Sequence, residues 1–169
     1  PDLLQLVVDS LRDMSCSGIP DGFVQVRAIG GTPPYHFTWA SGSNSPVRFG
    51  LAAGTYTANV TDYNNCTAQI QVQVKEPLPV TVNVAVFNRP LCQGDATGSI
   101  QVAASGGTPP YTYFWAGGQS GNSLADLPVG AYSVTARDSR GCLSLPLTVQ
   151  LLSQTTINLG IAVVPPPCV

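Results

Sequence analysis

Short segments in which hydrophobic and polar residues alternate recur along the chain, for example over residues 55–61, 67–75 and 79–87. This alternation is typical of a β-strand, because successive side chains point to opposite faces of a sheet. The hydrophobic residues that share one face of a segment are Tyr56, Ala58 and Val60, then Ile70, Val72 and Val74, then Val80, Val82, Val84 and Val86. The pattern predicts a chain built from short β-strands.

The whole pattern repeats at an offset of 76 residues, without an insertion, as from Cys16 to Cys92. The other recurring pairs include Gly22 and Gly98, Trp39 and Trp115, Leu51 and Leu127, Gly54 and Gly130, Tyr56 and Tyr132, Asp62 and Asp138, and Cys66 and Cys142. A fixed period indicates a repeat protein. We therefore predict one repeat over 1–77, a second over 78–153, and the first strand of a truncated third over 154–169, where Cys168 continues the spacing.

The repeat also decides how the opening segment is interpreted. Residues 3–14 could form an amphipathic helix with one apolar face, made of Leu4, Val7, Val8, Leu11 and Met14. The equivalent segment 79–87 alternates as a strand does. Because equivalent repeats should share a fold, we predict strands at about 3–9 and 79–87 and reject the helix.

Further strands are expected at 22–29 and 35–40, followed by a short variable stretch to Gly54 and a tight turn at 62–65. The inward-facing residues of the 22–29 strand and its counterpart are Val24, Val26, Ile100 and Val102. The last strand of the second unit is slipped by one residue, and a β-bulge near Pro146 would explain this. Residues 75–79 form a short linker stiffened by two prolines.

Antiparallel strands at this spacing predict an all-β fold, with tandem Ig-like or PKD-like β-sandwich repeats arranged head to tail. Trp39 and Trp115 are expected to fill the space between the two sheets of each sandwich. Tyr56 and Tyr132 follow a glycine at the start of the penultimate strand, which is the position of a tyrosine corner.

Charge and composition narrow the function further. The chain has 7 Lys and Arg against 9 Asp and Glu, so it lacks the clustered cations that nucleic-acid binding needs. Its longest apolar run is far shorter than the ~20 residues of a membrane helix, so no membrane insertion is expected. No signal peptide is recognisable, which led us to expect a mature segment of a secreted chain.

Three motifs recur in both units and give the chain a family resemblance. They are Gly-Gly-Thr-Pro-Pro-Tyr-x-x-x-Trp at 30–39, Leu-x-x-Gly-x-Tyr at 51–56, and Asp-x-x-x-Cys at 62–66. Each unit resembles the SprB repeat of long surface adhesins of gliding and related Bacteroidetes. The resemblance implies export by the type IX secretion system, a location on the outer cell surface, and a role in adhesion or gliding. It implies no catalytic residues.

Five cysteines without a Cys-x-x-Cys motif, with a single histidine, indicate disulfides and not a zinc site. One interpretation pairs cysteines within a unit, as Cys16–Cys66 and Cys92–Cys142. In an Ig-like topology, however, these cysteines belong to opposite ends of a sandwich, ~25 Å apart, whereas disulfide Cα atoms lie within ~7 Å. The alternative is a Cys16–Cys142 bridge between repeats, with Cys66 and Cys92 waiting for cysteines of preceding and following repeats.

Other candidate sites have weaker patterns. His36 has Thr112 as its counterpart, so no histidine-based catalytic arrangement recurs. Asp62 and Asp138 are expected to cap the turn before the last strand. A calcium site at this turn would need help from Asp21, Asp95 or Asp126, none of which recurs. Gln69, Gln71 and Gln73 alternate along one strand face, which is either solvated or able to bind glycans.

The leading hypothesis is a non-catalytic segment of a long secreted adhesin, which forms a stiff stalk or fibre and has no cofactor, no metal and no nucleic-acid partner. Its expected partners are neighbouring repeats, the type IX secretion machinery and surface polysaccharide. The alternative is a carbohydrate-binding accessory module of a secreted hydrolase.

Overall fold

The computed structural model describes residues 2–92 and 94–153. The chain divides into two compact units, Pro1–Leu78 and Pro79–Val169. In the described residues of both units the regular elements are β-strands, so the expected all-β fold is confirmed and the helix over 3–14 is absent. The expected first strand of a third repeat, 154–169, lies outside the described residues.

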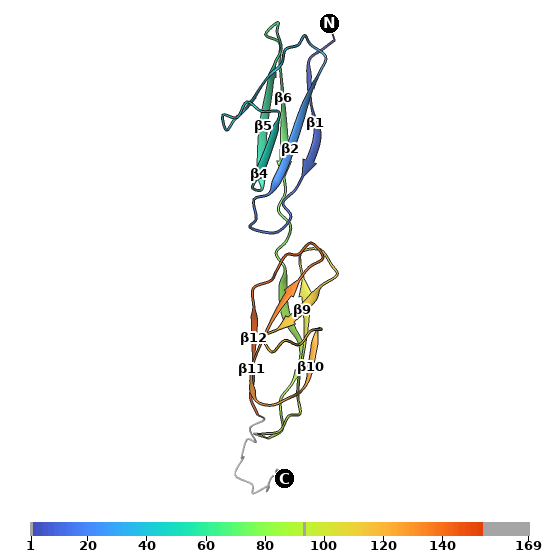
Figure 1. Cartoon of the computed structure of the whole chain (residues 1–169), viewed down its shortest axis with the longest axis vertical. Coiled ribbons are helices and arrows are strands. Elements are labelled where there is room, and N and C mark those ends of the chain that lie inside the picture. The colour runs from blue at the N-terminus through green and yellow to red at the C-terminus, as the bar shows by residue number, and fades with distance from the viewer. Residues whose placement is uncertain (1, 93, 154–169) are drawn as a thin grey trace, which may run out of the picture. The chain divides into compact units, whose positions relative to one another are not determined.

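Unit 1 is a sandwich of two three-stranded antiparallel sheets (Figure 1). One sheet has the order β1-β2-β4 and the other the order β3-β5-β6. The strands are β1 (Gln5–Arg12), β2 (Gly22–Ile29), β3 (His36–Trp39), β4 (Val47–Leu51), β5 (Gly54–Thr61) and β6 (Thr67–Val74). The chain passes from the first sheet to the second between β2 and β3, and back again between β3 and β4.

Unit 2 repeats this topology strand for strand. Its sheets have the orders β7-β8-β10 and β9-β11-β12. The strands are β7 (Thr81–Asn88), β8 (Gly98–Ser105), β9 (Thr112–Trp115), β10 (Ser123–Leu127), β11 (Gly130–Arg137) and β12 (Leu147–Leu151). The prediction of two like sandwiches follows from the sequence repeat, and the structure confirms it.

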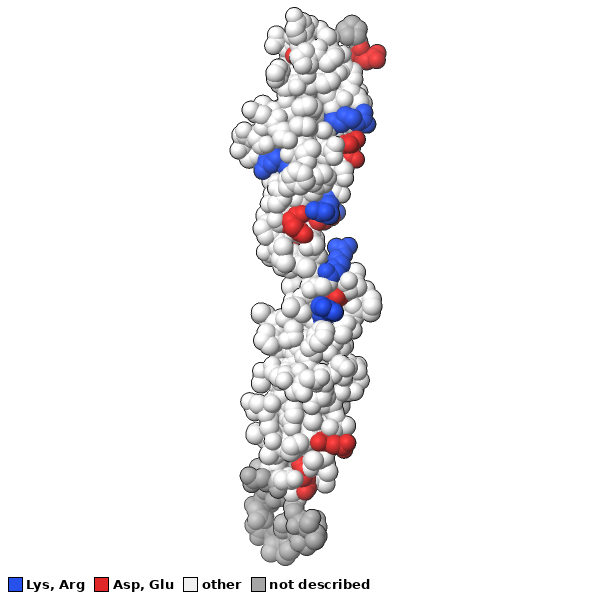
Figure 2. All heavy atoms as spheres, in the orientation of Figure 1, with Lys and Arg blue, Asp and Glu red and all other residues white. Residues whose placement is uncertain are grey.

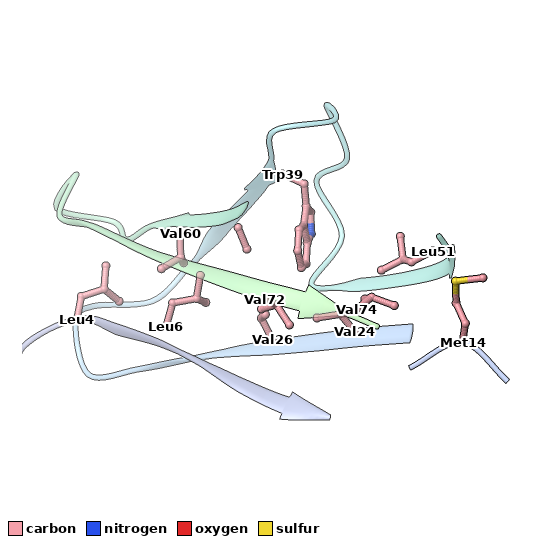
Figure 3. Packing of buried hydrophobic residues seen from close by; sticks show 11 residues of the cluster. Leu4, Leu6, Met14, Val24, Val26, Trp39, Leu51, Val60, Val72 and Val74 are labelled. Carbon is pink, nitrogen blue, oxygen red and sulfur yellow. The ribbon is translucent and has the colours of Figure 1, made fainter. Parts of the chain in front are cut away.

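The core of unit 1 lies between its two sheets (Figure 3). Val24 and Val26 on β2 face Val60 on β5 and Val72 on β6, and all four are buried. Trp39 at the end of β3 stands upright among them. The predicted inward residues of β2 and β8 are therefore correct, since Ile100 and Val102 are also buried.

The alternation along β1 and β7 is interrupted by a β-bulge. The register shifts between Val8 and Ser10 in β1 and between Val84 and Val86 in β7. Because the extra residue reverses the faces, Phe87 and not Val86 pairs with the buried Ile100. The expectation that Val86 shares a face with Val80 is wrong for this reason, and Val86 is exposed.

β4 and β10 were not predicted, since their segments were expected to be a variable stretch. β4 pairs with β2 through few residues, and its register is irregular between Gly22 and Val24. Gly50 within it has a positive φ of 64°. Both features remove the two-residue period by which a strand is recognised in a sequence.

The predicted bulge in the last strand of unit 2 is confirmed. In unit 1, Thr61 pairs with Thr67 and Ala58 with Ile70. In unit 2 the equivalent bridge joins Arg137 to Leu143, but Val134 pairs with Leu147, one residue further along.

Ser144 takes up the extra residue of this bulge. It is buried, its N–H donates to the Ala136 carbonyl at 2.8 Å, and its Oγ accepts the Ala136 N–H at 3.0 Å. A side-chain oxygen thus replaces a strand carbonyl. Pro146 then provides no N–H for the ladder, and the regular strand begins only at Leu147.

The first prediction concerns the glycine that opens β8. A Cβ on Gly98 would lie 2.7 Å from the Leu127 carbonyl oxygen and 3.1 Å from Leu151 Cδ1. We expect Gly98→Ala to destabilise the protein by about 1–3 kcal/mol, as overpacking does. Gly130→Ala is the matched control, because its Cβ would meet nothing closer than 3.6 Å; its effect should stay within about 0.5 kcal/mol. Urea unfolding midpoints measure both, and equal midpoints would contradict the packing argument.

Candidate functional site

The polar residue that organises each unit is the aspartate after its penultimate strand. Asp62 Oδ1 accepts hydrogen bonds from the N–H groups of Asn64 at 2.9 Å and Cys66 at 2.8 Å. Its Oδ2 accepts the N–H of Thr32 at 2.9 Å. Asp62 is only 3% exposed. One carboxylate therefore joins the β5–β6 turn to the loop between β2 and β3.

Unit 2 contains the same network. Asp138 Oδ1 accepts from Arg140 at 2.9 Å and Cys142 at 2.8 Å, and its Oδ2 accepts from Thr108 at 2.8 Å. The sequence predicted a turn cap at both aspartates but missed Thr32 and Thr108. The signal was available, since these threonines recur at the same spacing as the aspartates.

The Gly-Gly-Thr-Pro-Pro-Tyr motif provides the other half of this network. Gly31 has a φ of +64°, and a Cβ there would lie 2.9 Å from Asp62 Oδ2. The equivalent distance from Gly107 to Asp138 Oδ2 is 2.6 Å. A side chain would displace the carboxylate, so glycine is required at this position. The motif closes on itself, because the Tyr35 hydroxyl donates to the Gly30 carbonyl at 2.7 Å.

The network lowers the acidity constants of both aspartates. Burial of the carboxyl opposes ionisation, but the N–H groups of Thr32, Cys66 and Asn64 outweigh it and hold the pKa of Asp62 below its ordinary value. The pKa of Asp138 is lowered in the same way. Both groups are therefore carboxylates at neutral pH and serve as hydrogen-bond acceptors, and nothing in this arrangement poises them for proton transfer.

The tryptophans and tyrosines lie in equivalent places in the two units. Trp39 and Trp115 are 3% and 4% exposed, and each indole N–H donates to a backbone carbonyl, of Ser45 at 2.7 Å or Gly121 at 2.9 Å. The hydroxyls of Tyr56 and Tyr132 donate at 2.9 Å to the carbonyls of the residues four positions earlier, Ala52 and Pro128. This is the geometry of a tyrosine corner. These aromatic residues belong to the sandwich itself.

The cysteines differ in oxidation state. Cys16, Cys92 and Cys142 are disulfide-bonded, whereas Cys66 is a free and exposed thiol. The pairing Cys16–Cys66 is therefore wrong. The expectation that Cys92 waits for a cysteine of a following repeat is also wrong, because Cys92 is already bonded in this chain.

The remaining candidates do not assemble into a site. Asp21 accepts the N–H of Ser15 at 2.8 Å in the loop after β1, at the opposite end of the sandwich from Asp62. The calcium arrangement that would combine them is therefore excluded by distance along the strands. Across residues 2–92 and 94–153, no three His, Cys, Asp or Glu side chains gather as metal ligands.

The other polar candidates are exposed. His36 lies on β3, and Gln69, Gln71 and Gln73 alternate with less exposed residues along β6. Gln69 donates to Asn59 on the neighbouring strand at 2.8 Å. On the face shown in Figure 2, charged side chains are few and scattered over a mostly uncharged surface. No helix in the described part of the chain is long and apolar enough to cross a membrane.

The fold and these networks define a tandem Ig-like β-sandwich protein. Residues 9–44 and 85–120 match the family model of the SprB repeat, so the chain carries two SprB-type repeats and the resemblance is confirmed. No curated protein sequence matches the chain.

Solved structures with a similar fold come from several organisms. The three N-terminal domains of the outer capsid protein Hoc of bacteriophage RB49 give a TM-score of 0.53 at 13% identity, covering 89% of this chain and 59% of that one. The fibronectin(III)-like modules of Clostridium thermocellum CbhA give 0.37 at 16% identity, covering 88% and 94%. A fragment of intimin gives 0.42 at 12% identity, covering 86% and 64%. The similarity to Hoc supports the fold alone.

The second prediction tests the aspartate network through its pH dependence. Because the folded-state pKa of Asp138 lies below the unfolded value of about 3.9, its carboxylate stabilises the fold above that pH. This contribution disappears as the pH falls through the lowered pKa. Asp138→Asn loses one acceptor oxygen and places an amide N–H against backbone N–H groups. Its urea midpoint should fall clearly at about pH 7 and approach the wild-type midpoint at about pH 2.5.

Asp126→Asn is the matched control, since Asp126 is an exposed carboxyl on β10 with a positive φ of 55° that asparagine also tolerates. Its midpoint should follow the wild type at every pH. A constant difference between Asp138→Asn and wild type down to the lowest pH would show that the carboxylate is not the stabilising group.

Proposed function

We propose that this chain is a non-catalytic segment of a long secreted bacterial adhesin, located on the outer cell surface, where it forms a stiff stalk or fibre for attachment or gliding. The two SprB-type repeats support this proposal. SprB repeats and Ig-like domains are typically structural modules. Neighbouring repeats of the same chain are the first partners, and the type IX secretion machinery and surface polysaccharide complete the proposed set.

The observation that carries the proposal is the internal use of the recurring residues. Asp62, Trp39, Tyr35 and Tyr56 each bond to backbone groups of their own unit, and their counterparts in unit 2 do the same. What the two repeats share is therefore the means of building a sandwich. A segment repeated for its architecture serves as a spacer.

One observation favours the alternative, a carbohydrate-binding module. Phe23 and Phe49 form an aromatic pair on unit 1 with ring centroids 5.1 Å apart, and Phe49 is 70% exposed. Exposed aromatic rings can stack on sugars. However, the equivalent residues of unit 2 are Ser99 and Ala125, so this pair does not belong to the repeat.

The third prediction separates these two functions. The purified chain is applied to a glycan array, together with Phe49→Ser. A spacer should give no signal above background for either protein. Specific binding by the wild type that is lost in Phe49→Ser would overturn the spacer proposal in favour of the carbohydrate-binding module. Circular dichroism of both proteins controls for folding.

A further inference from the structure

We propose that a disulfide between Cys16 and Cys142 joins consecutive repeats and shields both of them from a pulling force. The bond is a claim about the chain whatever its biological role, and only its mechanical value rests on the stalk function proposed above. Both cysteines are disulfide-bonded. The argument uses the position of each cysteine within its own unit.

Cys16 lies at the end of unit 1 from which the linker leaves. The Met14 N–H donates to the Lys75 carbonyl at 3.0 Å, and the Lys75 N–H donates to Asp13 Oδ1 at 2.8 Å. The loop that follows β1 is therefore fastened to the residues that follow β6.

Glu76 extends this attachment into the linker itself. Its Oε1 accepts the Ser17 hydroxyl at 2.7 Å and the Gly18 N–H at 2.8 Å. The Ser17 hydroxyl, with the Gly18 N–H, holds the pKa of Glu76 below its ordinary value, so the clamp is charged at neutral pH. Cys16, directly before Ser17, is thereby held beside the start of the linker.

Cys142 lies at the end of unit 2 that the linker enters. Asp138 holds the Cys142 N–H and the Thr108 N–H together. A Cβ on the neighbouring Gly107 would lie 2.6 Å from Val80 Cγ2, so this loop packs against the residue that directly follows Pro79. The two cysteines thus lie at the two ends of one linker, each fixed by hydrogen bonds within its own unit.

The competing pairings within one unit fail on state or on distance. Cys66 is a free thiol, which removes Cys16–Cys66. Cys92 follows β7, at the end of unit 2 away from Val80 and Cys142, and the eight residues of β7 span about 26 Å. Disulfide Cα atoms lie within ~7 Å, so Cys92 does not reach Cys142.

The two turns with the same aspartate network also differ as this bridge requires. Cys66 is exposed and free, while Cys142 is buried and bonded. The local hydrogen bonds are the same in the two turns, so the turn itself does not decide the oxidation state. The partner cysteine does.

The mechanical consequence follows from the size of the covalent loop. A Cys16–Cys142 bond encloses 126 residues of the chain, from 142 minus 16. A force applied at the two termini would pass through the bond and could not extend the residues between. Full extension of that segment adds at most ~3.6 Å per residue, or about 450 Å, only after reduction.

Peptide mapping of the non-reduced chain tests the bond directly. Trypsin releases residues 13–27 with Cys16, but it leaves Cys142 and Cys168 together in residues 141–169. A second protease that cuts after leucine is needed to separate them, for example at Leu143 or Leu147. We expect a linked pair containing Cys16 and Cys142. A linkage of Cys16 to any other cysteine would overturn the proposal.

Single-molecule pulling gives a second and independent measurement. The gain in unfolded length on reduction should include about 450 Å for Cys16–Cys142, against about 180 Å for the 50 residues of Cys92–Cys142 and about 270 Å for the 76 residues of Cys16–Cys92. Cys16→Ser should abolish the 450 Å gain, and Cys66→Ser is the matched control that should retain it.

A misfolded Cys16→Ser variant leaves the test intact, because the wild-type chain with and without reductant gives the same comparison. A gain of about 180 or 270 Å without the longer one would refute the bridge between repeats. Neither result bears on glycan binding, so the bond and the spacer function can fail separately.

Discussion

A buried carboxylate at the end of each sandwich is the interaction on which the rest of the structure depends. The loop between β2 and β3 carries the chain from one sheet to the other, and its Thr32 N–H has Asp62 as acceptor. The same carboxylate accepts two N–H groups of the β5–β6 turn. Backbone N–H groups buried without an acceptor are costly, so one side chain fixes both loops. The glycine beside it has no Cβ because the carboxylate occupies that space.

Repetition of this device explains what the two units share and where they differ. The aspartate, the paired glycines, the buried indole and the tyrosine hydroxyl recur because each satisfies a backbone group that the sandwich buries. Surface residues such as Phe23 and Phe49 are free of that constraint, and Ser99 and Ala125 replace them in unit 2. A surface that changes from one repeat to the next, around a constant framework, is what a spacer needs.

The cysteines show how a local network and a distant partner divide their effects. Asp62 and Asp138 position Cys66 and Cys142 in the same way, through the same N–H group. One is nevertheless a thiol and the other a half-cystine. Hydrogen bonds within six residues set where a sulfur lies, but oxidation needs a second sulfur within bonding distance. Small domains with modest cores gain most from such a covalent link.

The sequence by itself determined the repeat, the all-β fold and most of the strands, because a two-residue period is a local property that each segment carries alone. It also located the bulge before β12, since a slipped period relative to the first repeat is visible without coordinates. Only the tertiary structure revealed β4 and β10, the bulges in β1 and β7, and the pairing of Asp62 with Thr32. Each of these depends on which backbone groups lie opposite one another across the fold, between residues far apart in the chain. Hydrophobic periodicity does not encode that proximity.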